Sequence, residues 1–414
     1  MRIVDVCAFY SPNGGGVRTY LENKLREAPR LGHEMILLVP GERHEFVLRG
    51  PGAVIATIAA PTLPVDRRYR YFDDQEALHR ALDLWQPDHV EVSSPWSSAT
   101  MVGRWQGPAS RSLVMHADPL AAYAYRWLGR VASIATIDRW FSGFWDHLRG
   151  LDRMFDLVVC AHQTLTDRLT AGGLRKAVTV RMGTEAGRFS PRHRSEKLRQ
   201  SMLDRLGLRA DAVLLLGIGR FAAEKRWPMV IQAVNRARRT RPVGLVLIGD
   251  GPNRLKLERL ARGLPNIAVL PVINDRDQLA RLLASVDGLV HGCEAETFCM
   301  VAAEARASGV PLLVPDFGAA YDQLLVGAGG SYRAGDVQSL ARAIVTFVDR
   351  DPARQRAQAR LQCKVRTIDD HFTEIFTAYG ELDGSRRRFD QSLAPHNRLV
   401  SHSAGLIPAL AAAS

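Results

Sequence analysis

The chain has 414 residues, of which 46% are apolar and 24% are charged, and its formal net charge is +12. This length suits two domains of about 150 to 200 residues, each with its own core, and the composition is that of an ordinary globular protein. No apolar run in the sequence approaches the roughly 18 residues needed to span a bilayer, so we expect no transmembrane helix.

The positive charge indicates an acidic partner, which could be nucleic acid, anionic lipid or a nucleotide-linked substrate. Arginine is spread along the chain and is not clustered with aromatic residues, which disfavours nucleic acid. The N-terminus reads as a strand and lacks the cleavage site of a signal peptide, so we expect a cytoplasmic protein. The five cysteines form no CxxC pair and no zinc-like spacing with histidine, which predicts reduced thiols.

The first half alternates strands and helices. Residues 1–10 predict a strand, SPNGGG a loop and VRTYLENKLREA a helix, and further strands follow in LGHEMILLVP, PDHVEVSS and LVMHADP. This alternation predicts a mainly parallel, doubly wound sheet, whose ligands lie beyond the carboxyl ends of the strands. The glycine loop and His116 would both lie at that edge. Three glycines let a backbone approach a ligand, although a tight turn explains them equally well.

Residues 121–150 concentrate Tyr, Trp and Phe between arginines. One interpretation is an amphipathic surface that touches anionic lipid or a lipid-linked acceptor. The other is a packed helix pair with the aromatic residues inside. Gly183, Gly187 and Pro191 then break the pattern, which places the domain boundary here.

The second half restarts the alternation with the buried strand DAVLLLGIGRF. Gly217, Gly219 and Ala222 fit a dinucleotide-binding pattern, but the helix does not open there, because Pro228 looks like its first-turn residue. Arg220 and Lys225 stand in the intervening loop, again at a carboxyl end. Two cations there could neutralise a departing diphosphate, whereas in isolation they would read as a solvated loop.

The stretch from His291 to Gly309 organises this half. A short strand feeds a loop with Glu294 and Glu296, and a helix that begins near Phe298 carries Glu304. The free N–H groups at a helix start form an anion site. Phosphates on that site, with a carboxylate on either side to accept from hydroxyls, would suit a sugar diphosphate. An ordinary surface helix with acidic residues in its first turns is the alternative.

Four segments occur in fixed order: the N-terminal strand with SPNGGG and its helix, GRFAAEKRWPMVIQAV, LIGDGP and EAETFCMVAAEARASGVPLLV. In order and wording they resemble the retaining glycosyltransferases of family 4, whose GT-B fold has two Rossmann-like, doubly wound parallel-sheet domains facing across a cleft. The resemblance covers nearly the whole chain up to about residue 380 and is more specific in the second half.

The resemblance implies an acceptor-binding domain over 1–185 and a nucleotide-sugar-binding domain over 186–382. It leaves open whether a final helix near 366–382 crosses back to the first domain. We expect 383–414 to be a mobile basic tail. The implied activity is transfer of a hexose, with retention, from a UDP- or GDP-sugar to a saccharide or lipid-linked acceptor. A peripheral position on the inner face of an anionic membrane would fit such an acceptor.

By the same resemblance, Arg220 and Lys225 bind the diphosphate, Glu296 holds the transferred sugar, Glu304 holds the ribose, and His116 lies near the sugar. The predicted catalytic residues are therefore His116, Arg220, Lys225 and Glu296. The predicted donor-binding residues are Gly15, Gly16, Arg220, Lys225, Thr297, Phe298, Cys299, Met300 and Glu304.

No cofactor or metal is implied. Asp275 and Asp277 form a D-x-D, but Asp277 reads as the cap of the next helix. Cys299 stands where the family usually has glycine, and its side chain would narrow the phosphate site. Two alternatives remain: a nucleotide-sugar epimerase of the same fold, and a non-catalytic protein that binds sugar nucleotides.

Overall fold

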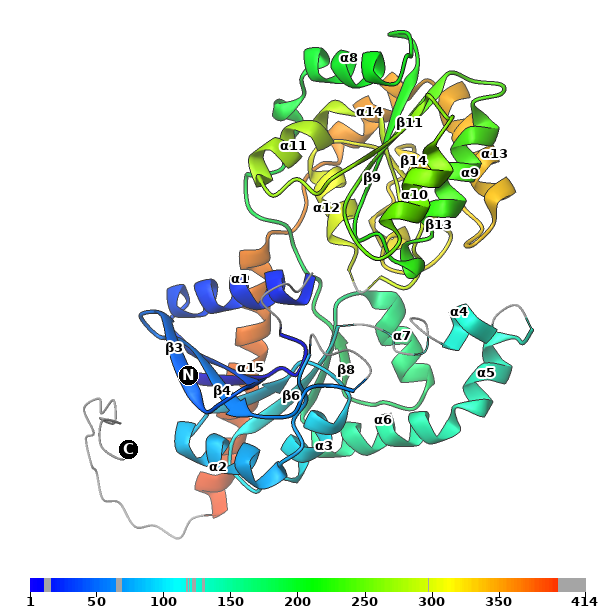
Figure 1. Cartoon of the computed structure of the whole chain (residues 1–414). Helices are drawn as coiled ribbons and strands as arrows, with labels where there is room; N and C mark the ends of the chain where they lie inside the picture. The colour runs from blue at the N-terminus through cyan, green and yellow to red at the C-terminus, as the bar shows by residue number, and fades with distance from the viewer. Residues whose placement is uncertain are drawn as a thin grey trace.

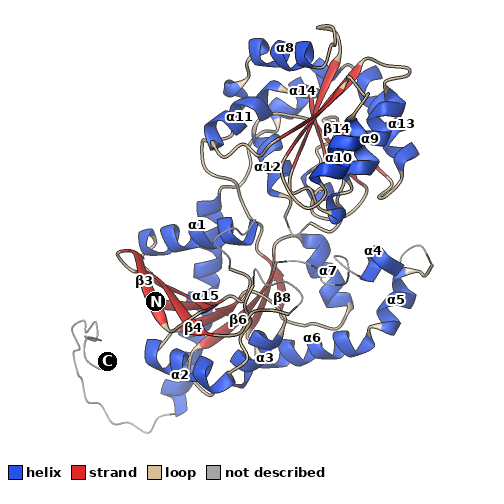
Figure 2. Cartoon of the chain, viewed as in Figure 1, coloured by secondary structure: helices blue, strands red, loops and turns tan. Residues whose placement is uncertain are grey.

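The structure is a computed structural model, and it describes residues 1–10, 16–64, 69–116, 118, 120, 124–128, 131–296 and 298–393. The predicted site residues Gly15 and Thr297 lie outside this part of the chain, as do residues 394–414 of the predicted tail 383–414, whereas 383–393 belong to the last helix. Two sheets with helices on both faces form two domains, one above the other in Figures 1 and 2. This architecture confirms the predicted pair of doubly wound parallel-sheet domains.

The first sheet has eight strands in the order β3-β4-β2-β1-β5-β6-β7-β8, all parallel except the edge strand β3, which is antiparallel to β4. Its strands are β1 (Arg2–Val6), β2 (Glu34–Gly41), β3 (Glu45–Gly50), β4 (Ala53–Ala59), β5 (His89–Val92), β6 (Ser110–Met115), β7 (Leu157–Cys160) and β8 (Ala177–Thr179). Its helices are α1 (Gly16–Arg30), α2 (Gln75–Trp85), α3 (Ser97–Arg104), α4 (Tyr125–Leu128), α5 (Ile134–Trp140), α6 (Ser142–Met154) and α7 (Gln163–Ala171).

The second sheet has six parallel strands in the order β11-β10-β9-β12-β13-β14. They are β9 (Val213–Ile218), β10 (Val243–Ile248), β11 (Ile267–Leu270), β12 (Gly288–Val290), β13 (Leu312–Pro315) and β14 (Gly329–Tyr332). The helices are α8 (Glu196–Arg205), α9 (Trp227–Ala237), α10 (Arg254–Ala261), α11 (Arg276–Ser285), α12 (Met300–Ala307), α13 (Val337–Asp349) and α14 (Pro352–Leu361), with 3-10 turns η2 (Pro191–His193), η3 (Ala223–Lys225) and η4 (Tyr321–Gln323). The central strands are uninterrupted apolar runs because helices cover both faces.

The last helix, α15 (Ile368–Leu393), packs against α1 and β6 of the first domain. Figure 1 shows it running beside the first sheet, although it follows the second domain in the chain. The two crossings between the domains touch, since Thr184 and Thr367 form a parallel bridge. A Cβ on Gly183 would lie 2.0 Å from the carbonyl oxygen of Thr367, so this contact requires glycine. Deeper in the domain, the Tyr379 hydroxyl donates to the buried carboxylate of Glu91 at 2.7 Å.

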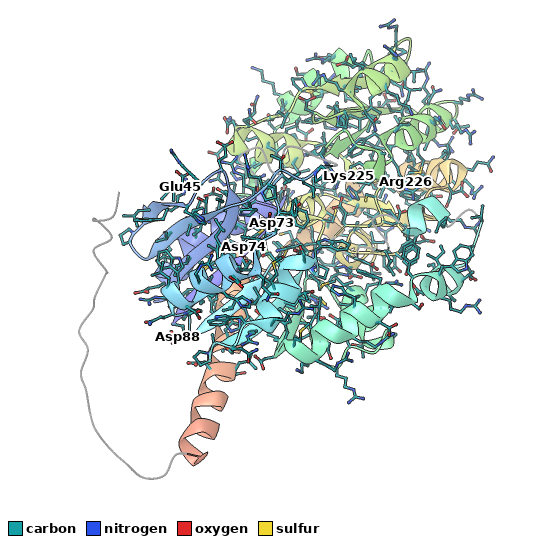
Figure 3. All side chains as sticks on the ribbon, turned by 60° about the horizontal axis from the view of Figure 1, so that its bottom comes forward. Glu45, Asp73, Asp74, Asp88, Lys225 and Arg226 are labelled. Atoms are coloured by element: carbon teal, nitrogen blue, oxygen red, sulfur yellow. The ribbon has the colours of Figure 1, made fainter. Side chains whose placement is uncertain are left out.

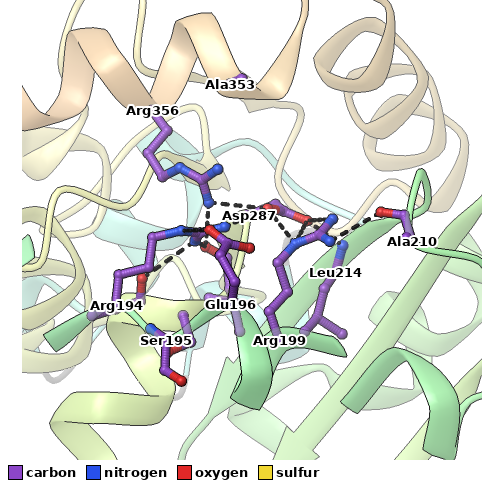
Figure 4. Close-up of polar contacts among 12 residues, drawn as sticks. Arg194, Ser195, Glu196, Arg199, Ala210, Leu214, Asp287, Ala353 and Arg356 are labelled. Atoms are coloured by element: carbon purple, nitrogen blue, oxygen red, sulfur yellow. Dashed lines mark hydrogen bonds and ion pairs between the residues drawn. The ribbon is translucent and has the colours of Figure 1, made fainter. Parts of the chain in front are cut away.

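The amino end of β12 is fixed by Asp287, which three arginines contact (Figure 4). Arg199 pairs with it at 2.7 Å, Arg356 at 3.1 Å and Arg194 at 3.7 Å. The Asp287 carboxylate also accepts from the N–H of Leu214 in β9. The cluster therefore connects α8 and α14 to the amino ends of the central strands, at the opposite end of the sheet from their carboxyl ends.

The described part of 121–150 contains both buried and exposed aromatic side chains, and the contact with lipid stays a prediction. Trp145 of α6 is buried with the first-domain core, whereas the Trp140 side chain at the end of α5 is 60% exposed. Val131, Ile134 and Phe141 are exposed beside it. Within the part of the chain that the structure covers, no helix combines the length and the apolar character needed to cross a membrane.

The predicted cap of α11 is wrong by two residues. Asp275 is the N-cap, because its carboxylate accepts from the N–H groups of Asp277 and Gln278. The side chain of Asp277 instead pairs with Arg188 at 3.0 Å. Both acidic residues thus have roles in the protein's own structure.

Candidate active site

The carboxyl ends of two neighbouring strands bring the predicted site together. β9 and β12 are parallel neighbours, so the loops that follow them leave the same edge of the sheet. The first loop carries Lys225 and Arg226, which lie beside each other at the side of the second domain nearest the first (Figure 3). The second carries Glu294 and Glu296.

Lys225 and Glu296 form an ion pair across these loops. Nε2 of His291, at the end of β12, lies 2.9 Å from Oε1 of the same carboxylate. Burial alone would raise the pKa of Glu296, but the Lys225 ammonium and His291 hold this pKa well below its usual range. Burial would likewise lower the pKa of Lys225, but Glu296 raises it to about 12. Both groups are therefore charged at neutral pH.

Arg226 and Glu294 form a second, bidentate pair beside the first. Nε of Arg226 donates to Oε2 of Glu294 at 2.9 Å, and Nη2 contacts Oε1. Arg226 adopts a φ of 51°, which ends the 3-10 turn and begins α9. The sequence prediction did not assign a role to His291 or Arg226. Their positions, at a strand end and next to Lys225, were the available signal.

Arg220 stands apart from these pairs. Its side chain is 59% exposed and pairs with Glu224 at 2.5 Å. Its carbonyl oxygen accepts from the indole N–H of Trp227, which fixes the backbone while the guanidinium stays in solvent. The same loop therefore holds two cations paired with the loop after β12, Lys225 and Arg226, and a third, Arg220, whose side chain is more exposed.

The helix α12 begins at Met300, two residues later than predicted. Cys299 precedes it at a φ of 59°, a left-handed conformation in which glycine costs least, which explains why glycine suits this position. The side chains of Phe298 and Met300 pack into an apolar cluster with residues of the first domain. Only their backbone groups are then available for an anion at the helix start.

Glu304 of α12 is almost fully buried and has a different partner from Glu296. Nη2 of Arg276 contacts its carboxylate at 2.6 Å and lies 3.5 Å from Glu185, at the domain crossing. Burial raises the pKa of Glu304, with Arg276 opposing and Glu185 adding to the shift. The two predicted carboxylates therefore have separate surroundings, Glu296 in the loop before α12 and Glu304 within the helix.

His291, Glu296 and Cys299 each place one potential metal-ligating atom within 4.8 Å of the others. Histidine, carboxylate and thiolate are zinc ligands, but only when the thiol is ionised. Burial raises the pKa of Cys299 far above its usual value, and the Lys225 ammonium already occupies the Glu296 carboxylate. The set fits a cation poorly, and the absence of a metal requirement stays a prediction.

His116 follows β6 on the first-domain side, as the strand pattern predicts. Burial lowers its pKa to about 4, so the ring is neutral at pH 7. Its Nε2 is buried and has no hydrogen-bond partner among the described residues. The ring packs edge-on against Tyr20, with 5.1 Å between the ring centres, and the Tyr20 hydroxyl lies 3.2 Å from Nε2 of His371 in α15.

The predicted donor-binding residue Gly16 is the first residue of α1, with open space where a Cβ would stand.

A cavity of about 690 Å³ lies between the two domains. Glu294, Ala295, Glu296, Phe317 and Gly318 line it from the second domain, and residues of α4 to α7 line it from the first. Among the described residues, Glu296 is the one predicted catalytic group in its wall; His116, Arg220 and Lys225 lie outside the lining.

Known proteins share this organisation. The family described as "Glycosyltransferase Family 4" matches residues 14–188, and the family described as "Glycosyl transferases group 1" matches residues 199–362. A GDP-mannose-dependent alpha-(1-6)-phosphatidylinositol dimannoside mannosyltransferase of Mycobacterium tuberculosis is 30% identical over 389 residues, 94% of this chain and 98% of that protein. A GDP-mannose-dependent alpha-mannosyltransferase of Corynebacterium glutamicum is 26% identical over 338 residues, 80% of this chain and 76% of that protein.

Solved structures agree on the fold. Sucrose-phosphate synthase from Thermosynechococcus elongatus superposes with a TM-score of 0.71 at 18% identity, covering 93% of this chain and 99% of that one. WaaG, a glycosyltransferase involved in lipopolysaccharide biosynthesis, gives 0.63 at 16% identity, covering 90% and 98%. The fold and the relatives together define a hexosyltransferase with the GT-B fold. The chain belongs to glycosyltransferase family 4.

Proposed function

We propose that the protein transfers a mannosyl group from GDP-mannose to a saccharide carried on an anionic lipid, with retention and without a metal. The donor is proposed from the two mannosyltransferases above, whose names specify GDP-mannose. The acceptor is proposed from the phosphatidylinositol dimannoside in the name of the first. The epimerase and the non-catalytic alternatives are disfavoured, because both relatives are named as transferases.

The observation that carries the proposal is the Lys225–Glu296 pair at the edge where a nucleotide sugar would lie. An incoming diphosphate would attract the Lys225 ammonium and the accessible Arg220 guanidinium, and would release Glu296 to accept from sugar hydroxyls. Cations fixed beside a leaving diphosphate stabilise the negative charge that develops as it departs. His116, neutral at pH 7, could exchange a proton with a sugar hydroxyl from the first-domain side.

Ligand-dependent thermal unfolding and product analysis test this proposal. We expect GDP-mannose to stabilise the protein more than UDP-glucose or ADP-glucose, since a ligand at 100 times its dissociation constant stabilises by about 2.7 kcal/mol. NMR of the product should give an α-linked mannose, and EDTA should leave the rate unchanged. Stabilisation by UDP-glucose alone would contradict the proposed donor, and a β-linked product would contradict retention.

We also propose that the protein works at the cytoplasmic face of an anionic membrane. Val131, Ile134, Trp140 and Phe141 are exposed apolar residues on and next to α5, and we call them the α5 apolar patch. Apolar side chains beside arginine suit shallow insertion among anionic head groups, and the net charge of +12 adds a long-range attraction.

A further inference from the structure

The first-domain wall of the interdomain cavity contains a hydrogen-bonded group that the proposed donor chemistry does not use. Its centre is Arg168 of α7, with Asp118 after β6 and Asp138 of α5 on either side. Tyr125 and Trp145 complete it, and all five residues line the cavity opposite Glu296. We call these residues the Arg168 group.

Arg168 is held in place from several directions. Its Nε lies 2.6 Å from Oδ2 of Asp118, and its Nη2 lies 3.1 Å from Oδ1 of Asp138. The guanidinium carbon also lies 4.6 Å from the ring centre of Tyr125 and 5.3 Å from that of Trp145. Two ion pairs and two cation–π contacts fix a side chain that is otherwise flexible, so the Asp138 carboxylate is pre-oriented.

Of the two carboxylate oxygens of Asp138, only Oδ1 has hydrogen-bond partners among the described residues. The Tyr125 hydroxyl, the Trp145 indole N–H at 3.3 Å and the guanidinium of Arg168 all contact Oδ1. Among the described residues, Oδ2 has no hydrogen-bond partner. Burial raises the pKa of Asp138, with the Trp145 hydrogen bond opposing this shift. A half-buried carboxylate oxygen without a partner in a cavity wall is suited to accept a ligand hydroxyl.

The charges in the cavity favour a neutral polyol over an anion in this part. Arg168 is paired with Asp118 and Asp138, and on the opposite wall Glu294 is paired with Arg226 and Glu296 with Lys225. The charged lining therefore consists largely of ion pairs, to which Arg139 and Arg149 of the first domain are added. A phosphate placed against Oδ2 of Asp138 would meet an acceptor of the same charge, whereas a sugar ring offers hydroxyls that both donate and accept. The same cavity is also lined by Ile134, which belongs to the α5 apolar patch, and by the exposed Arg139.

We propose that the Arg168 group binds the terminal sugar ring of the acceptor as a neutral hexopyranoside. Asp138 accepts a hydrogen bond from one of its hydroxyls through Oδ2, and Arg168, held by Asp118, is a positioning residue that orients the Asp138 carboxylate. The acceptor ring then lies across the cavity from Glu296, with its aglycone leaving past Ile134. This inference rests on the proposed function, because it assigns the second substrate of the same reaction.

Binding can be measured without any donor. Saturation-transfer NMR on the full chain with octyl α-mannopyranoside should give signals from the ring protons, and Asp138→Asn should weaken binding about ten- to a hundredfold, the cost of one hydrogen bond to a charged group. The matched control is Asp167→Asn, since Asp167 precedes Arg168 but bonds only to Gln163 in the described chain. Equal binding by wild type and Asp138→Asn would overturn the assignment, as would tighter binding of mannose 6-phosphate than of the neutral glycoside.

Steady-state kinetics distinguish a role in acceptor binding from a role in donor binding. With GDP-mannose and octyl α-mannopyranoside, Asp138→Asn and Arg168→Met should each raise the acceptor KM at least tenfold while the dissociation constant of GDP-mannose changes less than twofold. A fall in kcat alone, or a matching loss of donor affinity, would overturn the acceptor role. Failure of the wild type to use GDP-mannose would contradict the proposed function, while glycoside binding that depends on Asp138 would still support this inference.

Discussion

Lys225 and Glu296 meet although 71 residues separate them in the sequence, because the parallel strands β9 and β12 end side by side. Only 17% of the Glu296 side chain and 18% of the Lys225 side chain are exposed. The pair holds two opposite charges together, with Glu296 in the wall of the interdomain cavity. In the proposed reaction these charges are already positioned to bind the donor, and their pairing also contributes to the free energy of unfolding.

Lys225→Ala and Glu296→Ala should each abolish measurable transfer. Removing a preorganised charge beside a developing charge lowers kcat by about 10²- to 10³-fold. Each variant also leaves one partly buried charge without its partner, which costs about 1–3 kcal/mol of unfolding free energy. Transfer rates and chemical denaturation measure the two effects. Lys256→Ala, at an exposed lysine of α10, is the control and should change neither.

The stability effect should not be additive. Once one charge is gone, removing the other relieves an unpaired group, so the double variant should be less destabilised than the sum of the single variants. Additive losses would mean that the two side chains do not interact in solution. Wild-type transfer by either single variant would remove that residue from the mechanism.

The sequence predicted the elements better than the pairings within the site. Strand ends, the helix through Glu304 and the position of His116 follow from local patterns and from the carboxyl-edge rule. The partner of Glu304 does not, because Arg276 belongs to another helix and reaches it only in the folded domain. The helix begins two residues later than predicted for a local reason. Cys299 takes a left-handed conformation, which is not expected for a cysteine from the sequence.

Cys299→Gly should be nearly neutral for stability, whereas Cys299→Val should cost about 2 kcal/mol or more. Glycine adopts a positive φ freely, which offsets the loss of the buried thiol, but a β-branched residue is strongly disfavoured there. Thermal unfolding of both variants checks this. If the thiol narrows the phosphate site, the glycine variant should also bind GDP-mannose more tightly. Equal stability of the two variants would contradict the left-handed assignment.

Glu91 should make stability fall as pH rises from about 4.5 to about 7. Burial and the neighbouring Asp5 raise the pKa of Glu91 to about 7, against the opposing effect of Lys24. Between the unfolded and folded pKa values the folded protein holds a proton that the unfolded chain releases, so a higher pH favours unfolding. Denaturation across this range should show a flatter profile for Glu91→Gln. Glu76→Gln, at an exposed residue of α2, should keep the wild-type slope, and identical slopes for all three proteins would refute the shift.

Membrane binding should depend on the α5 apolar patch and on salt. Trp140→Ser removes an exposed aromatic side chain that would insert among head groups, so flotation with vesicles rich in anionic lipid should fall several-fold. Raising the ionic strength should weaken the wild type in the same assay, because the attraction of a positively charged protein is screened. Leu361→Ser is the matched control: Leu361 is 82% exposed on α14 of the second domain, so the change removes a similar apolar group away from the patch. Binding to neutral vesicles at the same level, or an equal effect of both substitutions, would show that this surface does not contact the membrane.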